Sequence, residues 1–426
     1  MRPLSVFVTD GEQRPALAIA RSLGRRGVEV VVGAAQSHSL ASASKYCIRH
    51  VRYPSPHHQP DAFDRFLLDF VGRERVDVVL PVTDVTTHLV AKKAAAINRF
   101  AATALPSFDA FDSVSDKATL LRRAAASGVP IPRTLVVENR DALPALLDQI
   151  ACPVVVKPAR SRIRTGNGWL ATSVHYARDR AELLQLYRDV TYLDRYPSMI
   201  QQRIVGPGTG VFVLCDRGRL CEAFAHRRLR EKPPSGGVSV LCESIALDHR
   251  LVDHAMRLLA PLGWHGLAMV EFKQDRDTGR AYLMEVNGRF WGSLQLAIDA
   301  GIDFPYLCCQ LALREPLPPR RGYEVGVKSR WLLGDLDHLF IRMFHGERDQ
   351  QLPDGMPSRR RALCEFLRLA GARLHYDVIS RDDPRPFLHE VRQYARQLAA
   401  SAIDGTRKLF EPQCIEQESR HVGVLK

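Results

Sequence analysis

Residues 265–289, HGLAMVEFKQDRDTGRAYLMEVNGR, consist of two apolar stretches around a turn at 275–279, which predicts a β-hairpin. Glu271 lies in the first stretch, and Glu285 and Asn287 stand two residues apart in the second. Because side chains alternate along a strand, Glu285 and Asn287 share a face that Glu271 can join across the hairpin. An unpaired buried carboxylate is costly, and carboxylate and amide oxygens suit a Mg²⁺ ion that also binds phosphates. We therefore expect a magnesium site at these three residues, the alternative being a solvated strand face.

Three further features indicate phosphate binding. Lys157 ends an apolar strand, and Lys117 begins a helix, where a cation opposes the helix dipole and so indicates another use. The loop 165–168, Thr-Gly-Asn-Gly, has glycines that let backbone N–H groups face a phosphate. Arg289 lies two residues beyond Asn287, where it can meet an anion. Each lysine alone is most simply a surface residue, but the set predicts a triphosphate clamp.

The composition of the 426-residue chain excludes several classes of protein. Hydrophobic residues make up 46% and charged residues 25%, which is typical of globular domains and excludes disordered and fibrous proteins. No apolar stretch of about 18 residues is free of charge, so no membrane span is expected. The apolar N-terminal stretch is too short for a signal peptide, and the nine Cys contain no C-x-x-C pair. We therefore expect a cytoplasmic protein with reduced thiols and no structural zinc.

The net charge of +13 is compatible with nucleic acid, a membrane surface or an anionic small molecule as partner. The excess is almost all arginine, 50 Arg against 10 Lys, a usage that could equally reflect genomic base composition. One basic cluster is HRRLREK at 226–232. Strand alternation predicts that Arg228 and Arg230 share a face there, where bidentate guanidinium groups would bind an acceptor carboxylate. The alternatives are a solvated basic strand and a nucleic-acid contact.

Strands and helices alternate along the first hundred residues, which predicts an α/β fold with a parallel sheet and helices on its faces. The first turn, at 9–12, lacks G-x-G-x-x-G, so we expect a Rossmann-like fold without a dinucleotide site. Residues 105–115 are expected to be a linker. Farther on we expect helices at 118–128, 141–150, 251–263 and 294–313, extended segments at 129–137, 152–159 and 198–229, and a glycine hairpin at 161–172. Beyond 317 the pattern weakens to helical stretches at 330–344, 358–370 and 387–409, with a frayed end from 412.

The order of these motifs resembles the ATP-grasp superfamily. The matching segments are residues 116–117, 128–132, 156–158, 165–168, 200–206, 271 and 285–289. Each motif alone is weak, whereas six in this order are specific. The resemblance covers roughly residues 1–345. Within the superfamily, the chain looks most like predicted carboxylate ligases that are similar to one half of carbamoyl phosphate synthetase.

The resemblance implies an α/β chain whose clamp is α+β. A Rossmann-like pre-ATP-grasp domain would be followed by a two-lobed ATP-grasp domain and a mainly helical C-terminal extension. The expected boundaries are 1–108 for the first domain, 109–198 for the small lobe with the glycine loop, 199–318 for the large lobe with the metal site, and 319–426 for the extension. That extension could pack on the core or form a homodimer.

The resemblance also implies a role for each candidate residue toward ATP and its metal. Lys117 and Lys157 would contact the phosphates, and Thr165, Gly166 and Gly168 would close over the γ-phosphate. Gln202 and Ile204 would recognise adenine at an interlobe hinge. Glu271, Glu285 and Asn287 would coordinate Mg²⁺, with Mn²⁺ as the alternative, and Arg289 would steady the transferred phosphoryl group. Lys157 and Arg289 would be the catalytic residues. The acidic residue that usually follows the hinge is missing, since this position offers only Thr209, so ribose recognition stays open.

The expected activity is ATP-dependent ligation, in which a small-molecule carboxylate is activated as an acyl phosphate and captured by an amine or another nucleophile. Two alternatives belong to other classes. A nucleic-acid-binding module would explain the charge, but no helix is solidly basic and the known motifs are absent. A nucleotide-binding regulatory protein would keep the fold and lose the metal residues, which are all present here.

Overall fold

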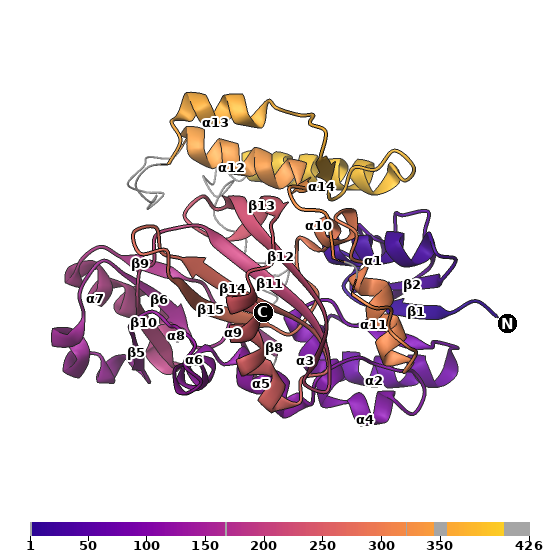
Figure 1. Cartoon of the computed structure of the whole chain (residues 1–426), viewed down its shortest axis with the longest axis horizontal. Helices are drawn as coiled ribbons and strands as arrows, with labels where there is room; N and C mark the ends of the chain where they lie inside the picture. The colour runs from indigo at the N-terminus through magenta and orange to yellow at the C-terminus, as the bar shows by residue number, and fades with distance from the viewer. Residues whose placement is uncertain (1, 167, 321, 345–355, 404–426) are drawn as a thin grey trace, which may run out of the picture.

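The computed structural model describes residues 2–166, 168–320, 322–344 and 356–403. Its N-terminal unit is a parallel sheet in the order β3-β2-β1-β4 (Figure 1). The strands are β1 (Ser5–Val8), β2 (Glu29–Ala34), β3 (Cys47–Arg52) and β4 (Val78–Leu80). Alternation along β1 buries Val6 and Val8 against α1 (Arg14–Gly24) and buries Phe7 against helices on the other face. Those helices are α2 (Pro60–Arg73), α3 (Asp84–Lys92) and α4 (Ala94–Ile97).

A small antiparallel sheet follows, in the order β5-β10-β6-β9. Its strands are β5 (Thr134–Val137), β6 (Val154–Pro158), β9 (His175–Ala177) and β10 (Ser198–Gln202). Helices α7 (Arg180–Asp189) and α8 (Thr191–Arg195) pack on it through buried Leu183, Tyr187 and Leu193. The expected glycine hairpin is present as β7 (Arg162–Thr165) paired with β8 (Gly168–Ala171).

Two expectations for this region are wrong. The segment expected to be a linker contains helix α5 (Phe108–Ser115), because the Ser107 side chain caps it by accepting a hydrogen bond from the Ala110 amide at 3.3 Å. The expected helix at 141–150 is instead two 3₁₀ segments, Arg140–Ala142 and Pro144–Gln149. Pro144 has no N–H and would clash with a preceding carbonyl in a continuous α-helix.

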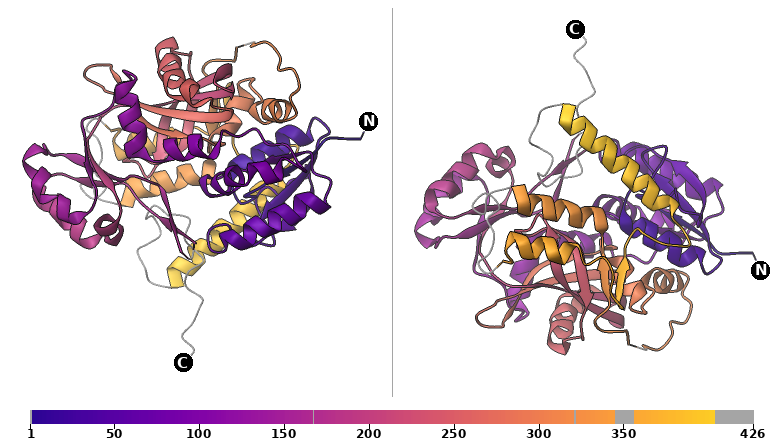
Figure 2. Two further views of the ribbon diagram at one scale, coloured as in Figure 1. Left: turned by 90° about the horizontal axis from the view of Figure 1, so that it is seen from below. Right: turned by 90° about the horizontal axis from the view of Figure 1, so that it is seen from above.

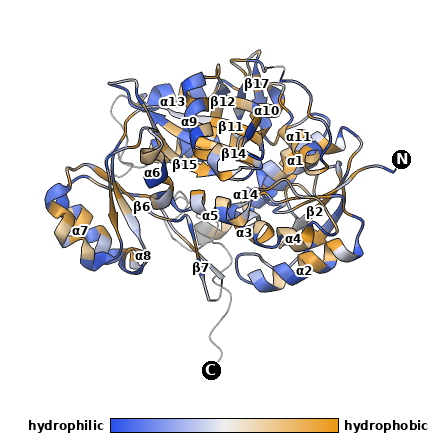
Figure 3. Cartoon of the chain, turned by 60° about the horizontal axis from the view of Figure 1, so that its bottom comes forward, coloured by the Kyte–Doolittle hydropathy of each residue, from blue (hydrophilic) through white to orange (hydrophobic). Residues whose placement is uncertain are grey.

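The large sheet has seven strands in the order β15-β14-β11-β12-β13-β16-β17. They are β11 (Gly208–Asp216), β12 (Arg219–Lys232), β13 (Val238–Ser244), β14 (Gly266–Gln274), β15 (Ala281–Asn287), β16 (Lys328–Arg330) and β17 (Leu374–Tyr376). One face packs against α5, α6 (Lys117–Ala126) and α9 (His249–Leu259). The other face packs against α1, α10 (Leu294–Asp299) and α11 (Phe304–Ala312). The central strands are accordingly apolar in Figure 3.

The C-terminal segment contributes helices α12 (Leu332–Phe344), α13 (Arg359–Phe366) and α14 (Arg385–Ile403), as expected. It also contributes β16 and β17, which the helical interpretation omitted, because three-residue strands carry too little periodicity to be recognised in a sequence. Helix α14 lies across the N-terminal unit (Figure 2). The end from 412 that we expected to be frayed lies outside the described residues.

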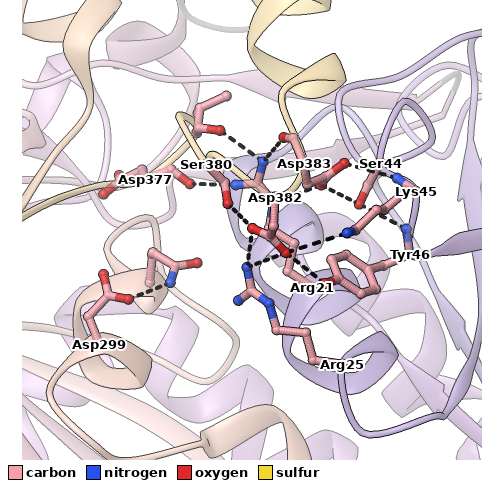
Figure 4. A network of polar contacts seen from close by, with 12 residues as sticks. Arg21, Arg25, Ser44, Lys45, Tyr46, Asp299, Asp377, Ser380, Asp382 and Asp383 are labelled. Carbon is pink, nitrogen blue, oxygen red and sulfur yellow. Dashed lines mark hydrogen bonds and ion pairs between the residues drawn. The ribbon is translucent and has the colours of Figure 1, made fainter.

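Residues 377–383, which we call the strap, hold the C-terminal segment against the N-terminal unit (Figure 4). The Arg21 guanidinium on α1 donates to the Asp383 carboxylate at 2.9 Å and to the Val378 carbonyl at 2.9 Å. The Asp383 carboxylate also accepts from the Ser44 hydroxyl at 2.6 Å and from the Lys45 amide at 3.0 Å. These groups are buried, so the strap joins the two ends of the chain through the interior. No helix in the described ranges has the length and apolarity needed to cross a membrane.

Candidate active site

The three predicted metal ligands lie together on adjacent strands. Glu271 on β14 is directly opposite Glu285 on β15, and Asn287 is opposite Met269, two residues farther on the same face. The Asn287 side-chain amide donates to Glu285 Oε1 at 2.9 Å. Among the described residues no three His, Cys, Asp or Glu side chains form a metal-binding group. A hard cation here would therefore take two carboxylates and one amide oxygen, with its remaining ligands from phosphates or water, a donor set that fits Mg²⁺.

Two protein cations balance these carboxylates. Lys117 Nζ lies 3.7 Å from Glu285 Oε2, and the Arg228 guanidinium donates to Glu271. Burial raises the pKa of Glu271 against the opposing charge of Arg228. Burial would also raise the pKa of Glu285, but Lys117, the hydrogen bond from Asn287 and Lys157 together hold it well below its usual range. The pair therefore has one firmly ionised carboxylate, Glu285, and one whose charge depends on its cationic partner.

The two predicted phosphate lysines face the same junction between the small and large sheets. Lys117 is the first residue of α6, whose cap is the Asp116 carboxylate accepting from the Thr119 amide at 2.9 Å. Its Nζ donates to the Ser161 hydroxyl at 2.6 Å. Lys157 Nζ lies 3.7 Å from the Met284 sulfur on β15, and burial lowers the pKa of Lys157 to about 8. Sequence patterns did not indicate Ser161 or Met284, because both contacts join segments that are far apart in the sequence.

The glycine hairpin lies against the N-terminal unit. Gly168 has φ +148, and a Cβ there would lie 2.5 Å from the carbonyl oxygen of His57, so only glycine fits this approach. The Arg164 guanidinium, two residues before Gly166, binds Asp61 of α2 at 3.1 Å. Thr165 pairs with Gly168 at the tip, and the residue between Gly166 and Gly168 lies outside the described residues.

The predicted hinge connects the two sheets. β10 ends at Gln202, whose amide donates to the Arg133 carbonyl at 2.9 Å. The Gln202 side chain is exposed, and Ile204 is buried. Gly206 has φ +155, and a Cβ there would lie 1.8 Å from the Gln274 carbonyl at the end of β14. The geometry places both residues at an interlobe junction, and their role toward adenine stays a prediction.

Arg289 reaches across to the N-terminal unit. Its Nε donates to the Asp84 carboxylate at 2.8 Å, and its Nη2 donates to Asn287 Oδ1 at 3.3 Å. Asp84 is the first residue of α3 and follows Thr83, which caps that helix. The sequence offered a signal for Asp84, a polar residue four positions after the buried strand β4, but no pattern links positions 205 residues apart.

The structure separates the two predicted substrate arginines. The β12–β13 pairing is irregular between Arg228 and Arg230 and again after Arg230, so simple alternation fails there. Arg228 binds Glu231 at 2.8 Å as well as Glu271, and so belongs to the metal-site face. Arg230 instead donates to Asp335 on α12 at 2.6 Å, a carboxylate 1% exposed. The expectation that both arginines serve one acceptor site is therefore not supported, and Arg230 has a structural partner.

A pocket that is open to solvent, with a cavity volume of ≈ 50 Å³, lies beside Lys117 where four parts of the chain meet. The N-terminal unit contributes Asp84 and His88, α5 contributes Phe111, Val114 and Ser115, the hairpin region contributes Arg160, Ser161, Arg162 and Trp169, and β15 contributes residues 285–287. The predicted metal and phosphate residues thus border a space that small molecules can enter.

Comparison with known proteins agrees with this architecture. Residues 194–331 match a family described as ATP-grasp in the biosynthetic pathway with Ter operon. The structure is similar to an L-amino acid ligase from Bacillus licheniformis (22% identity, TM-score 0.56, covering 74% of this chain and 75% of that chain). It is also similar to a biotin carboxylase from Campylobacter jejuni in complex with β-γ-ATP (18%, 0.61, 77% and 74%).

A third similar structure is the biotin carboxylase domain of the 2-oxoglutarate carboxylase from Hydrogenobacter thermophilus, in complex with MgADP, ADP and bicarbonate (14%, 0.60, 76% and 73%). At such identities the likeness concerns the fold. Together with the family match over residues 194–331, it confirms the predicted fold class: the chain has the α/β architecture of ATP-grasp proteins.

Proposed function

We propose that this chain is a Mg²⁺- and ATP-dependent ligase that joins a small-molecule carboxylate to an amine or a similar nucleophile. The observation that carries the proposal is the shared face of Glu271, Glu285 and Asn287, opposed across the sheet junction by Lys117 and Lys157. Two phosphate-binding cations opposite a hard-oxygen donor set are what a nucleoside triphosphate with its metal requires.

Glu271, Glu285 and Asn287 would hold the Mg²⁺, which supplies neutralisation of charge on the phosphates. In the reaction, an oxygen of the substrate carboxylate forms a bond to the γ-phosphorus as the bond from that phosphorus to the β–γ bridging oxygen breaks, giving an acyl phosphate and ADP. The nucleophile then attacks the acyl carbon and expels inorganic phosphate. No nucleophilic side chain of the protein is needed, so the work of the chain is positioning and electrostatics.

The predicted phosphate-binding residues and the glycine hairpin have a place in this scheme. Lys117 and Lys157 would bind the transferred and leaving phosphates. Burial lowers the pKa of Lys157 to about 8, so the charge of this side chain changes with pH near neutrality. Arg289, which is held in place by its ion pair with Asp84, would stabilise the phosphoryl group during its transfer. The glycine hairpin, which packs against the N-terminal unit, would exclude water and so protect the acyl phosphate from hydrolysis.

Hydroxylamine tests this scheme without knowledge of the natural amine, since it converts an acyl phosphate to a hydroxamate and phosphate. We expect ATP- and Mg²⁺-dependent hydroxamate formation with at least one acid from a panel of carboxylates. The double variant Glu285→Ala/Asn287→Ala should lose this activity by at least about 10³-fold while keeping its unfolding profile. Asp277→Ala, in the exposed turn of the same hairpin, is the matched control and should behave as wild type.

Three results would overturn the proposal or its site. Hydroxamate formation retained in the double variant would refute the metal assignment. Tight ATP binding with no acid-dependent product would favour a nucleotide-binding regulatory protein. Salt-sensitive RNA binding together with no acid-dependent product would favour a nucleic-acid-binding module.

A further inference from the structure

Three aromatic rings from separate parts of the chain form one wall of the cavity beside Lys117. His88 comes from α3, Phe111 from α5 and Trp169 from β8 of the hairpin, three elements labelled close together in Figure 1. The centroid of the His88 ring lies 4.9 Å from that of Trp169 and 6.3 Å from that of Phe111, both edge to face. Val114 adds an aliphatic surface to the same wall. No part of the proposed chemistry uses these side chains.

The wall is uncharged at neutral pH even though cations surround it. Burial lowers the pKa of His88 to about 4, and the neighbouring charge of Asp112 only partly opposes this effect. His88 therefore contributes a neutral ring, which packs against apolar groups at little cost. The Trp169 Nε1 atom is buried and has no hydrogen-bond partner among the described residues.

The cavity also has polar lining residues, and one of them is an available cation. Arg160 is occupied, because Asp112 accepts two hydrogen bonds from it at 2.6 and 2.9 Å. Arg162 lines the same cavity, and its side chain makes no ion pair or hydrogen bond with another described residue. A guanidinium that lines the same pocket as Lys117 and Glu285 can hold a carboxylate near the proposed phosphoryl transfer.

We propose that this cavity is the acceptor subsite and that it selects a carboxylic acid carrying an aromatic or branched apolar group. The inference rests on the proposed function, because it names the class of carboxylate that the proposed ligase activates. The carboxylate lies toward Arg162 and Lys117, and the apolar group packs on Trp169, Phe111 and His88. A small or doubly charged acid would leave that wall unfilled or place a charge against it, which costs binding free energy.

The hydroxamate assay with MgATP tests this selectivity on four probe acids. We expect kcat/KM for 3-phenylpropionate and isovalerate to exceed that for acetate and succinate at least tenfold. Trp169→Ala should reduce the preference roughly tenfold, chiefly through KM, because about one ring face of apolar contact is lost. Phe100→Ala removes an exposed aromatic ring elsewhere on the N-terminal unit and should keep the wild-type preference.

A matched pair at His88 separates recognition from a folding defect. His88→Phe keeps a flat neutral ring and should keep the preference for the apolar acids, whereas His88→Asp places a charge in the wall and should abolish it. Equal use of all four acids by the wild type, or the same selectivity in both His88 variants, would overturn the subsite while leaving the ligase intact. Absence of hydroxamate with every acid would overturn the ligase proposal and the subsite together.

Discussion

Replacing Asp383 with alanine should destabilise the protein far more than the same change at the adjacent Asp382. The Asp383 side chain is 1% exposed and its partner Arg21 is 3% exposed, so the pair is fully desolvated. Asp383→Ala removes the acceptor for Arg21 Nε, the Ser44 hydroxyl and the Lys45 amide. It leaves the guanidinium buried with only backbone carbonyls. Breaking a buried pair by removing one partner costs about 3–5 kcal/mol.

Asp382 is the matched control because it belongs to the same strap and is also ion-paired. Its side chain is 42% exposed and bonds the half-exposed Arg25 at 3.0 Å. Exposed pairs contribute about 0–1 kcal/mol, since water and salt screen them. Urea unfolding followed by circular dichroism should therefore give a clear loss of unfolding free energy for Asp383→Ala and almost none for Asp382→Ala.

Two results would refute the reasoning. One is a loss below about 1 kcal/mol in Asp383→Ala, which would mean that solvent or movement of the strap compensates the unpaired guanidinium. The other is measured in the double variant Arg21→Met/Asp383→Leu. We expect this variant to unfold with a free energy close to that of the wild type, because apolar replacement of a buried pair is often neutral. If the two single losses simply add in the double variant, the ion pair is not the origin of the effect.

Two further predictions concern the site and its supports. Burial lowers the pKa of Lys157 to about 8, so at higher pH its neutral amine must take up a proton before it can bind phosphates as an ammonium group. The affinity for a non-hydrolysable MgATP analogue should therefore fall up to about tenfold per pH unit above pH 8. Calorimetry that shows constant affinity from about pH 7 to 9.5 would contradict this role. Arg230→Met should lower the unfolding free energy by about 3 kcal/mol, because buried Asp335 keeps only Arg330, while analogue affinity stays within about twofold of wild type; lost affinity in a normally stable variant would return Arg230 to the substrate site.

Local periodicity predicted the part of the site that lies on a single hairpin. Strand alternation placed Glu285 and Asn287 on one face, and the position of the turn placed Glu271 opposite them. Alternation and turn position depend only on residues that are near in the sequence. Alternation failed at Arg230, where the pairing of β12 with β13 shifts register. A bulge depends on how two strands pair, so it leaves no signal in the alternation of one strand.

Contacts between distant segments could not be predicted from the sequence. Asp84 meets Arg289 and Arg21 meets Asp383 only because four sheets and their connecting helices fold together. The sequence also could not show which cations near the cavity are already paired. Arg160 and Arg162 are two residues apart in one basic run, yet only Arg160 has carboxylate partners in the described part of the chain. Tertiary pairing therefore decides which charges are available to a ligand.

Tertiary pairing also shows where several of the 50 arginines are used, although an ion pair adds nothing to the net charge of +13. Arginines at the junctions between units are paired with carboxylates of another segment, as in Arg14 with Asp377, Arg21 with Asp383, Arg230 with Asp335 and Arg289 with Asp84. A guanidinium suits these places because it stays charged when buried and binds carboxylates with a planar fork. Lysine, whose pKa falls on burial, is found instead at Lys117 and Lys157 facing the proposed phosphates. These four arginines are held by carboxylates of the same chain, so they are not available to a nucleic-acid backbone and serve instead to join the units.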